Sequence, residues 1–269
     1  MKSYQQVFSE LRDKGALVPF IVIGDPDYET SLNIAKKIVD SGADILELGI
    51  PFSDPIADGP TIQEADIRAL KNGMNTDKAF EFVSDLRRYT DIPIGILCYY
   101  NLIYQYGLPR FYSNAAKSGI NSILIADAPL EELSDSLKEV TKNKLDSVLM
   151  ISPLTSDERI KQIASKVTGF IYVVSRLGVT GIKSDLRSST LQLVKRIKKH
   201  TDKPLCVGFG ISKPEHVKAI IGAGADGAIV GSAIVDLIGK NLKDKKKILS
   251  ELDRFLKTMK NVTDLDRNL

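Results

Sequence analysis

Hydrophobic residues recur along the chain in two alternating patterns. Short runs rich in aliphatic and β-branched residues predict strands, and the longer stretches between them carry apolar residues three and four positions apart, which is typical of amphipathic helices. In the segment 31–42, for example, Leu32, Ala35 and Ile38 share one helical face and Gly42 ends the helix. The predicted strands are 17–23, 44–50, 92–98, 120–126, 145–151, 169–174, 204–209 and 226–231.

Eight strands that alternate with helices predict parallel strands joined by crossover helices. They could close into a barrel or form an open doubly wound sheet. An open sheet that binds a dinucleotide carries Gly-x-Gly-x-x-Gly after its first strand, whereas residues 23–27 read Ile-Gly-Asp-Pro-Asp. We therefore predict one α/β domain over residues 1–269, a (β/α)8 TIM barrel with an extra N-terminal helix. Its active site should lie at the C-terminal ends of the strands.

Composition and charge narrow the classes of function. Hydrophobic residues make up 43% and charged residues 26% of the chain, a balance typical of soluble globular proteins. The net charge of +3 arises from 37 basic and 34 acidic residues, too even a balance to indicate nucleic-acid binding. The basic stretch 240–247 is expected on the solvent face of a polar C-terminal helix. We expect Cys98 and Cys206, which lie in apolar runs, to be buried free thiols.

The sequence also predicts where the protein resides. It has no apolar run of the roughly 20 residues that a membrane crossing needs. Its first fifteen residues show an amphipathic pattern without the continuous apolar core of a signal peptide. We therefore expect a cytoplasmic protein that binds no membrane.

Glu47 is the first candidate for chemistry. It lies in the middle of the second predicted strand, where alternation places it on the face opposite the bulky aliphatic residues Leu46 and Leu48. Those residues suit the helix layer, so Glu47 should point into the barrel. The alternative is a structural ion pair, but no predicted strand carries Lys or Arg in its middle. Burial would raise the pKa of Glu47, as suits a general acid–base group.

The loop after that strand, residues 51–60, carries two more carboxylates. Asp54 before Pro55 and Asp58 before Gly59 each match common turn chemistry and, taken alone, favour a structural role. Their position on the active-site side of the barrel, next to an inward glutamate, makes them candidate site residues.

Two glycine-bearing segments, 207–212 and 229–233, follow the seventh and eighth strands, where barrels commonly hold phosphate. Glycine lets backbone N–H groups approach an anion, and a following helix directs its positive end toward it. The loop 175–182 after the sixth strand has the residues of a lid or of a third phosphate contact.

The candidate residues exclude several chemistries. His200 and His216 lie in helical patterns, away from the predicted strand ends, so we expect no metal site. A Schiff base with substrate needs a lysine at a strand end, but Lys144, Lys166 and Lys203 precede strands, and the one well-placed basic residue, Lys183, lies in a loop. The chemistry predicted from the residues uses carboxylates and a phosphate site, without a cofactor.

The segment 46–63, LELGIPFSDPIADGPTIQ, closely resembles the signature of the tryptophan synthase α chain family. The resemblance continues in order over most of the chain. Its further segments are PF at 19–20, YYNL at 99–102, ADAP at 126–129, YVVSRLGVTG at 172–181, GFGIS at 208–212 and GSAIV at 231–235.

This resemblance implies cleavage of indole-3-glycerol phosphate to indole and glyceraldehyde 3-phosphate, without metal or cofactor. It implies that Glu47 is the acid–base group, that Asp58 sits at the indole nitrogen, and that Thr180 holds Asp58 when the loop closes. Phe20 and Tyr172 would flank the ring. The implied phosphate ligands are backbone groups of Gly181, Gly210 and Gly231, with Ser232.

The family resemblance also implies a partner, a β subunit that carries pyridoxal phosphate and receives the indole within an α2β2 complex. Asp54, Asn101 and Pro129 match loops that face that subunit. Cys98, Ala128 and Leu177 depart from the commonest family pattern and bear on loop closure and partner contact. Two other functions remain open from the residues, a stand-alone indole-3-glycerol phosphate lyase and a non-catalytic phosphate-binding regulatory barrel.

Overall fold

The computed structural model describes residues 1–12, 14–174, 188–208 and 210–263. Its strands are β1 (Ala16–Val22), β2 (Leu46–Gly49), β3 (Ile94–Cys98), β4 (Ser122–Ile125), β5 (Asp146–Ser147), β6 (Leu149–Ile151), β7 (Ile171–Val174), β8 (Leu205–Gly208) and β9 (Gly227–Val230). Its helices are α1 (Tyr4–Leu11), α2 (Tyr28–Asp40), α3 (Pro60–Lys71), α4 (Thr76–Arg87), α5 (Tyr100–Tyr106), α6 (Leu108–Ser118), η1 (Leu130–Leu133), α7 (Ser134–Lys142), α8 (Asp157–Lys166), α9 (Ser188–Lys198), α10 (Pro214–Gly222), α11 (Ser232–Lys240) and α12 (Lys245–Thr263).

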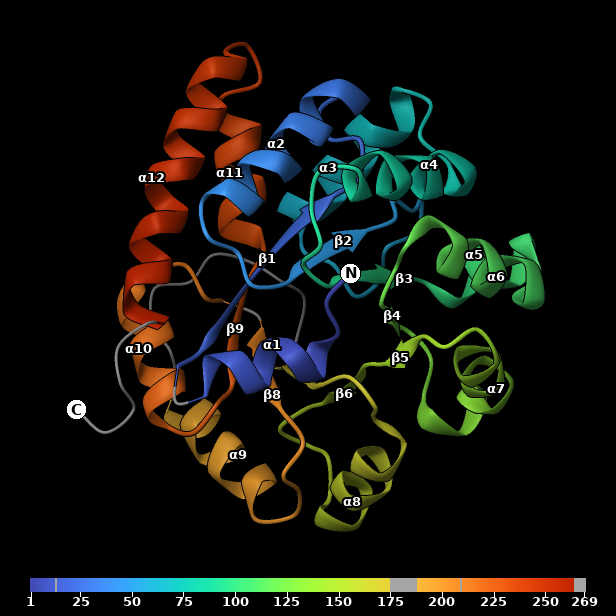
Figure 1. The fold of residues 1–269 in the computed structure, drawn as a ribbon, viewed down its shortest axis with the longest axis vertical. Helices are drawn as coiled ribbons and strands as arrows, with labels where there is room; N and C mark the ends of the chain where they lie inside the picture. The colour runs from blue at the N-terminus through green and yellow to red at the C-terminus, as the bar shows by residue number, and fades with distance from the viewer. Residues whose placement is uncertain (13, 175–187, 209, 264–269) are drawn as a thin grey trace.

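The strands form a parallel barrel. Their order is β5-β4-β3-β2-β1-β9-β8-β7-β6, so the first and last strands of the chain are neighbours. The two ends of this order, β5 and β6, are separated in sequence by Val148 alone, and the chain itself therefore closes the ring. Figure 1 shows the helices arranged around the strands. The predicted barrel is confirmed.

The fifth strand differs from the prediction of one strand over 145–151. Its first half, β5, pairs with β4, and its second half, β6, pairs with β7. The chain changes partner at Val148, which is buried. The sequence pattern cannot reveal this change, because the pairing partners of the two halves lie in distant segments of the chain.

Several strands also begin later than predicted because their leading residues belong to turns. Asp44, expected at the start of a strand, instead accepts a hydrogen bond from the Leu17 backbone N–H at 2.8 Å. Its carboxylate also pairs with Lys260 of α12 at 2.8 Å. The strand β2 therefore starts at Leu46.

The N-terminal helix closes one end of the barrel. Its Tyr4 is buried, packs edge to face on Phe170 at 5.4 Å and hydrogen-bonds to Ser122, the first residue of β4, at 2.7 Å. Gly95 in β3 leaves room for this contact, since a Cβ there would lie 2.9 Å from the Tyr4 hydroxyl. Because α1 covers the N-terminal ends of the strands, the C-terminal ends form the accessible mouth.

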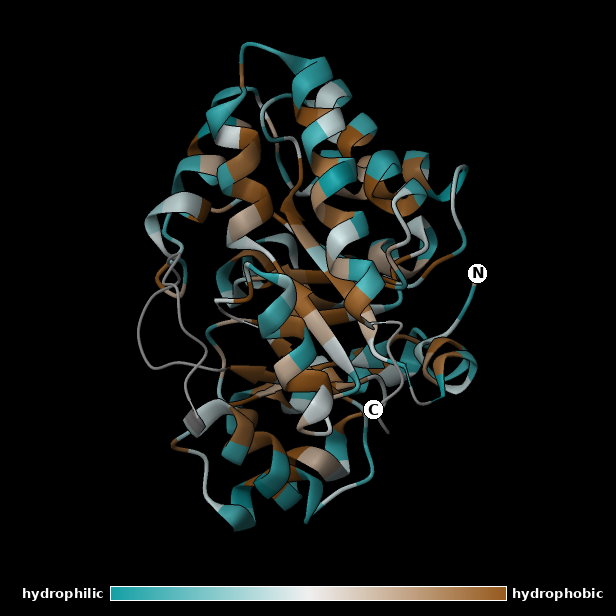
Figure 2. Ribbon diagram, turned by 90° about the vertical axis from the view of Figure 1, so that its left-hand side faces the viewer, coloured by the Kyte–Doolittle hydropathy of each residue, from teal (hydrophilic) through white to brown (hydrophobic). Residues whose placement is uncertain are grey.

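The outer layer follows the amphipathic pattern. Figure 2 shows hydrophobic strands in the centre and helices with hydrophilic outer faces. The basic stretch 240–247 spans the end of α11, a turn and the start of α12, which corrects its assignment to one polar helix. The helix α12 itself buries Ile248, Leu252 and Leu256 and packs on α2 and α10. Within the described ranges, no helix is both long and apolar enough to span a bilayer.

Candidate active site

Glu47 points into the barrel from β2. Register aligns it with Phe20 of β1 and Gly95 of β3, and its side chain is only 4% exposed. It lies in the barrel interior together with Val18 and Ser122, which belong to other strands of the ring. This position matches the alternation in the sequence.

Burial gives Glu47 an unusual protonation state. Its Oε2 atom has no hydrogen-bond partner among the described residues. Burial, with a smaller contribution from the negative charge of Asp58, raises the pKa of Glu47 to about 8. The carboxyl group therefore carries its proton at neutral pH and is able to donate it.

Asp58 lies at the mouth, in the loop between β2 and α3. Its Oδ2 atom accepts a hydrogen bond from the Tyr99 hydroxyl at 2.6 Å. Burial raises the pKa of Asp58, while this hydrogen bond to the charged form lowers it. The same Tyr99 oxygen accepts the Ala57 backbone N–H at 3.1 Å, and the Phe52 ring stacks on the Tyr99 ring at 5.1 Å. The end of β3 thus holds the loop that carries Asp58.

Two residues of this site were not singled out from the sequence. Tyr99 entered only as part of a family segment, although a tyrosine directly after a strand was a usable signal. Asp66 lies in α3, where a charged residue reads as solvent-facing, yet it is 4% exposed. Burial and the charge of Asp58 raise the pKa of Asp66 to about 8, and the Phe52 backbone hydrogen-bonds to it. Asp66 is a second anchor of the loop.

Two aromatic side chains on the barrel strands interact electrostatically with these carboxyl groups or lie in register with them. Phe20 and Tyr172 are 6% and 5% exposed and come from β1 and β7, on either side of β8 and β9. Glycines make room for both rings. A Cβ at Gly231 would lie 3.2 Å from the Phe20 ring, and one at Gly208 would overlap the Tyr172 ring.

The register of the strands places further apolar residues on the inner face of the barrel. Leu97 aligns with Gly49 and with Leu124, and Met150 aligns with Tyr172. Aligned residues of parallel strands face the same side, so these apolar side chains also line the mouth.

The two glycine segments lie side by side at the mouth, since β8 pairs with β9. Gly210 has a φ of +81°, a conformation that other residues rarely adopt. Gly231 is the N-cap of α11 and Ser232 is its first residue, so the positive end of this helix lies beside Gly210's loop. Of the expected phosphate ligands, Gly231 and Ser232 therefore stand at a helix N-terminus and Gly210 follows the neighbouring strand β8.

His216 corrects one expectation. It was predicted to lie away from the strand ends, but its Nδ1 atom is 3.3 Å from the Ser212 backbone nitrogen and 3.1 Å from the Gly210 carbonyl oxygen. The first turn of α10 returns to the end of β8, so a residue in a helical pattern reaches the glycine loop. His216 helps to fix the shape of that loop.

Other residues named from the sequence lie outside the described residues or away from the two carboxyl groups. Thr180 and Gly181, as well as Leu177, are outside the described residues. Cys98 and Cys206 are buried free thiols, as expected. Cys98 follows the inward Leu97 and so faces the helix layer, away from the pocket. Ala128 borders a separate cavity next to the mouth.

The rim carries the residues expected to face a partner. Asp54, Asn101 and Pro129 are exposed and follow the consecutive strands β2, β3 and β4. Large apolar side chains are also exposed after these strands, with Ile56 at 75% in the loop before α3 and Tyr104 at 64% in α5. Exposed apolar groups beside polar ones are typical of an interaction surface.

Comparison with known proteins identifies the family. The family model described as tryptophan synthase alpha chain matches residues 8–264. The chain is 49% identical over 258 residues to the tryptophan synthase alpha chain of Methanothermobacter thermautotrophicus, covering 96% of this chain and 95% of that one. It is 42% identical to that of Salmonella typhimurium, covering 97% and 98% of the two chains.

Solved structures of tryptophan synthase have a similar fold over nearly the whole chain. A chain of Mycobacterium tuberculosis tryptophan synthase superposes with a TM-score of 0.89 at 29% identity, covering 98% of this chain and 100% of that chain. A chain of the Pyrococcus furiosus tryptophan synthase α2β2 complex superposes with a TM-score of 0.85 at 38% identity, covering 92% and 98%. With a family model and relatives that match nearly its whole length, the chain belongs to the tryptophan synthase alpha chain family.

Proposed function

We propose that this chain cleaves indole-3-glycerol phosphate into indole and glyceraldehyde 3-phosphate, with Glu47 as the acid–base group and Asp58 as its electrostatic partner. The observation that carries this proposal is a buried, protonated carboxyl group beside a second carboxylate in an apolar pocket. The reaction is that of a carbon–carbon lyase.

Glu47 moves the proton. Its carboxyl group donates a proton to C3 of the indole ring, which turns the ring into an iminium-like electron acceptor. The bond between C3 and the glycerol carbon then breaks, and its electron pair restores the aromatic ring. The Glu47 carboxylate takes the proton that leaves the hydroxyl group on that carbon, so an aldehyde forms and Glu47 is protonated again. Since the protonated ring accepts the electron pair, the step needs neither a Schiff base nor a Lewis acid.

Asp58 stabilises the charge that this step creates. Positive charge develops on the ring nitrogen after protonation at C3, and a carboxylate already in place lowers the energy of that state. The hydrogen bond from Tyr99 favours the ionised form of Asp58. Phe20 and Tyr172 would hold the ring between them, and Gly210, Gly231 and Ser232 would bind the phosphate.

We further propose that the indole passes to a β subunit that carries pyridoxal phosphate, within an α2β2 assembly. The exposed rim of Asp54, Ile56, Asn101 and Pro129 supports this partner. The Pyrococcus furiosus relative forms a tryptophan synthase α2β2 complex with mutual activation. Glu47 and Asp58 argue against a purely regulatory barrel, since binding alone requires neither group.

Replacing Glu47 with Gln tests the proposed chemistry. The change keeps the size of the side chain and removes its ionisable proton, so turnover should fall by about 10²–10⁴-fold. Binding of glyceraldehyde 3-phosphate should change little, because the phosphate site lies on β8 and β9. Release of glyceraldehyde 3-phosphate from the substrate measures turnover, and calorimetry measures binding. Cleavage at the wild-type rate by this variant would refute the role of Glu47.

A further inference from the structure

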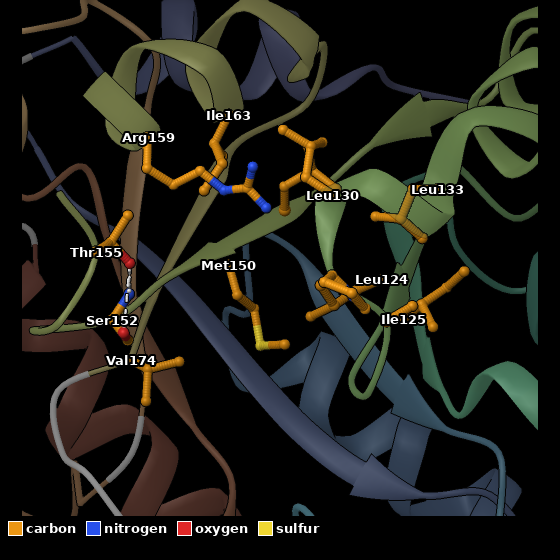
Figure 3. Close-up of a pocket in the computed structure, with 13 residues that line it drawn as sticks. Leu124, Ile125, Leu130, Leu133, Met150, Ser152, Thr155, Arg159, Ile163 and Val174 are labelled. Carbon is orange, nitrogen blue, oxygen red and sulfur yellow. Dashed lines mark hydrogen bonds between the residues drawn. The ribbon is translucent and has the colours of Figure 1, made fainter. Parts of the chain in front are cut away.

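A cavity of about 400 Å³ lies beside the barrel mouth, within the range of small-molecule sites. Figure 3 shows side chains from η1, α8 and the ends of β4, β6 and β7 around it. Its lining is Leu124, Ile125, Ala128, Pro129, Leu130, Leu133, Leu149, Met150, Ser152, Thr155, Arg159, Ile163 and Val174. We call it the seam cavity.

The seam cavity exists because the barrel ladder is open at this point. Strand β4 pairs with β5 through Ser122 and Ile123 only. Strand β6 pairs with β7, and no pairing joins it to β4 among the described strands. The C-terminal halves of β4 and β6 therefore stand apart, and the space between them is roofed by η1 and α8.

The seam cavity shares three residues with the inner face of the barrel, where Phe20 and Tyr172 are proposed to hold the indole ring. Leu124, Met150 and Val174 line it, and their alternation with outward neighbours places all three on the inner face of the barrel. Met150 and Val174 are only partly buried. The opposite wall is formed by Leu130, Leu133 and Ile163 from outside the strands.

The walls favour apolar occupants. Arg159 is the one charged side chain in the lining, and its guanidinium forms a two-point contact with Glu131 of η1, one arm at 2.5 Å. This ion pair lowers the pKa of Glu131 to about 2, and it bridges α8 and η1. Because the Arg159 guanidinium is already paired with Glu131, it offers little attraction to an anionic substituent.

We propose that the seam cavity admits apolar substituents on the benzene ring of the substrate, at C5 or C6 of the indole. The inference rests on the proposed function, which holds the ring nitrogen and C3 from the β2 side through Asp58 and Glu47. C5 and C6 form the opposite edge of the indole ring system and therefore point away from β2, toward Met150 and Val174. The chain then accepts 5- and 6-substituted indole-3-glycerol phosphates as a substrate class.

The test compares unsubstituted, 5-methyl and 6-methyl indole-3-glycerol phosphate on the full chain, by release of glyceraldehyde 3-phosphate, a product common to all three. We expect kcat/KM of the wild type for the methyl substrates to lie within about tenfold of the parent value. Leu130→Trp fills the far wall and should lower kcat/KM for the methyl substrates at least about tenfold more than for the parent. Leu130 is half-buried, so a larger side chain can be accommodated. Leu242→Trp, at a 38% exposed position between α11 and α12, is the matched control. It should leave unchanged the kcat/KM of each methyl substrate relative to that of the parent.

A second variant does not depend on tolerance of a bulky residue. Met150→Ala widens the passage and should raise kcat/KM for 6-ethyl indole-3-glycerol phosphate relative to the parent. The inference would be overturned if the wild type cleaved the parent but had a kcat/KM about 10³-fold lower for both methyl substrates. It would also be overturned if neither Leu130→Trp nor Met150→Ala changed the kcat/KM of the substituted substrates relative to that of the parent. Failure to cleave the parent itself would overturn the proposed function instead, and this inference with it.

Discussion

At the scale of single residues, the site depends on carboxyl groups whose ionisation is set by burial. Glu47 and Asp66 both have a pKa raised to about 8, while Asp58 between them is assisted toward ionisation by Tyr99. An acid that keeps its proton, near a carboxyl group whose charged form accepts a hydrogen bond, suits proton delivery and charge stabilisation.

Stability of the Glu47→Gln variant should depend on pH. The folded pKa of Glu47, about 8, exceeds the ordinary value of 4.5, so the folded state binds this proton more tightly than the unfolded state. The stabilisation from Glu47 is complete below about pH 4.5 and is lost as pH rises to about 8. The free energy of unfolding of the variant should therefore rise relative to that of the wild type over this pH window, by an amount on the order of several kcal/mol. Urea unfolding at pH 5, 7 and 9 measures the difference. A difference that stays constant with pH would show that Glu47 is already ionised in the folded state.

Tyr99→Phe tests the positioning of Asp58. The variant keeps the ring that stacks on Phe52 and loses the hydroxyl that binds Asp58 and Ala57. The pKa of Asp58 should rise, so the acid limb of kcat/KM should move to higher pH, and turnover should fall about tenfold or more. Tyr104→Phe, at an exposed position, is the control. An unmoved acid limb in Tyr99→Phe would leave the tyrosine without a role in tuning Asp58.

At the scale of elements, the proposed phosphate site depends on two loops that share one edge of the barrel. Gly210 needs its left-handed backbone, and Gly231 begins α11 against the Phe20 ring. His216 of α10 contacts the first loop, so the helix that follows β8 also shapes it. Anion binding at this proposed site would be a property of the pair of loops and of the helix end.

Gly231→Asp should abolish phosphate binding more than it disturbs folding. Its matched control is Gly231→Ala, because either Cβ would press on Phe20 at 3.2 Å and only Asp adds charge. The Asp variant should raise KM far above that of the Ala variant. Glyceraldehyde 3-phosphate should raise the Tm of the wild type and of Gly231→Ala, but not that of Gly231→Asp. Equal protection of all three proteins would place the phosphate elsewhere.

At the scale of the whole molecule, the barrel has one closed end and one exposed end. The helix α1 seals the N-terminal end through Tyr4, whereas the loop after β2 exposes Asp54 and Ile56. Asp58 lies in the same loop as Asp54 and Ile56. A partner that orders this loop would therefore also order a catalytic carboxylate.

Titration with a cognate β subunit should raise the turnover of this chain. By linkage, a substrate analogue that orders the loop should tighten partner binding by the same factor. Asp54→Ala should weaken this coupling and leave phosphate binding intact. Asp202→Ala, exposed just before β8 and so at the opposite end of the barrel, should behave as the wild type. A flat titration, with no association in sedimentation at micromolar concentration, would favour the stand-alone lyase.

The amino-acid sequence by itself determined the order of the elements and the inward direction of Glu47. Both depend on the alternation of side chains along a strand, which is a local property of the backbone. The glycines at helix ends were likewise readable, since Gly42, Gly119 and Gly224 all adopt positive φ. These features need no knowledge of distant neighbours.

Tertiary structure alone decided the features that depend on contacts between distant segments. The split of the fifth strand follows from its two different partners, β4 and β7. The hydrogen bond from Tyr99 to Asp58 joins residues 41 positions apart, and the burial of Asp66 arises from the loop that folds over it. The raised pKa values follow from the same packing, because desolvation and through-space charge act on distances that no linear pattern encodes.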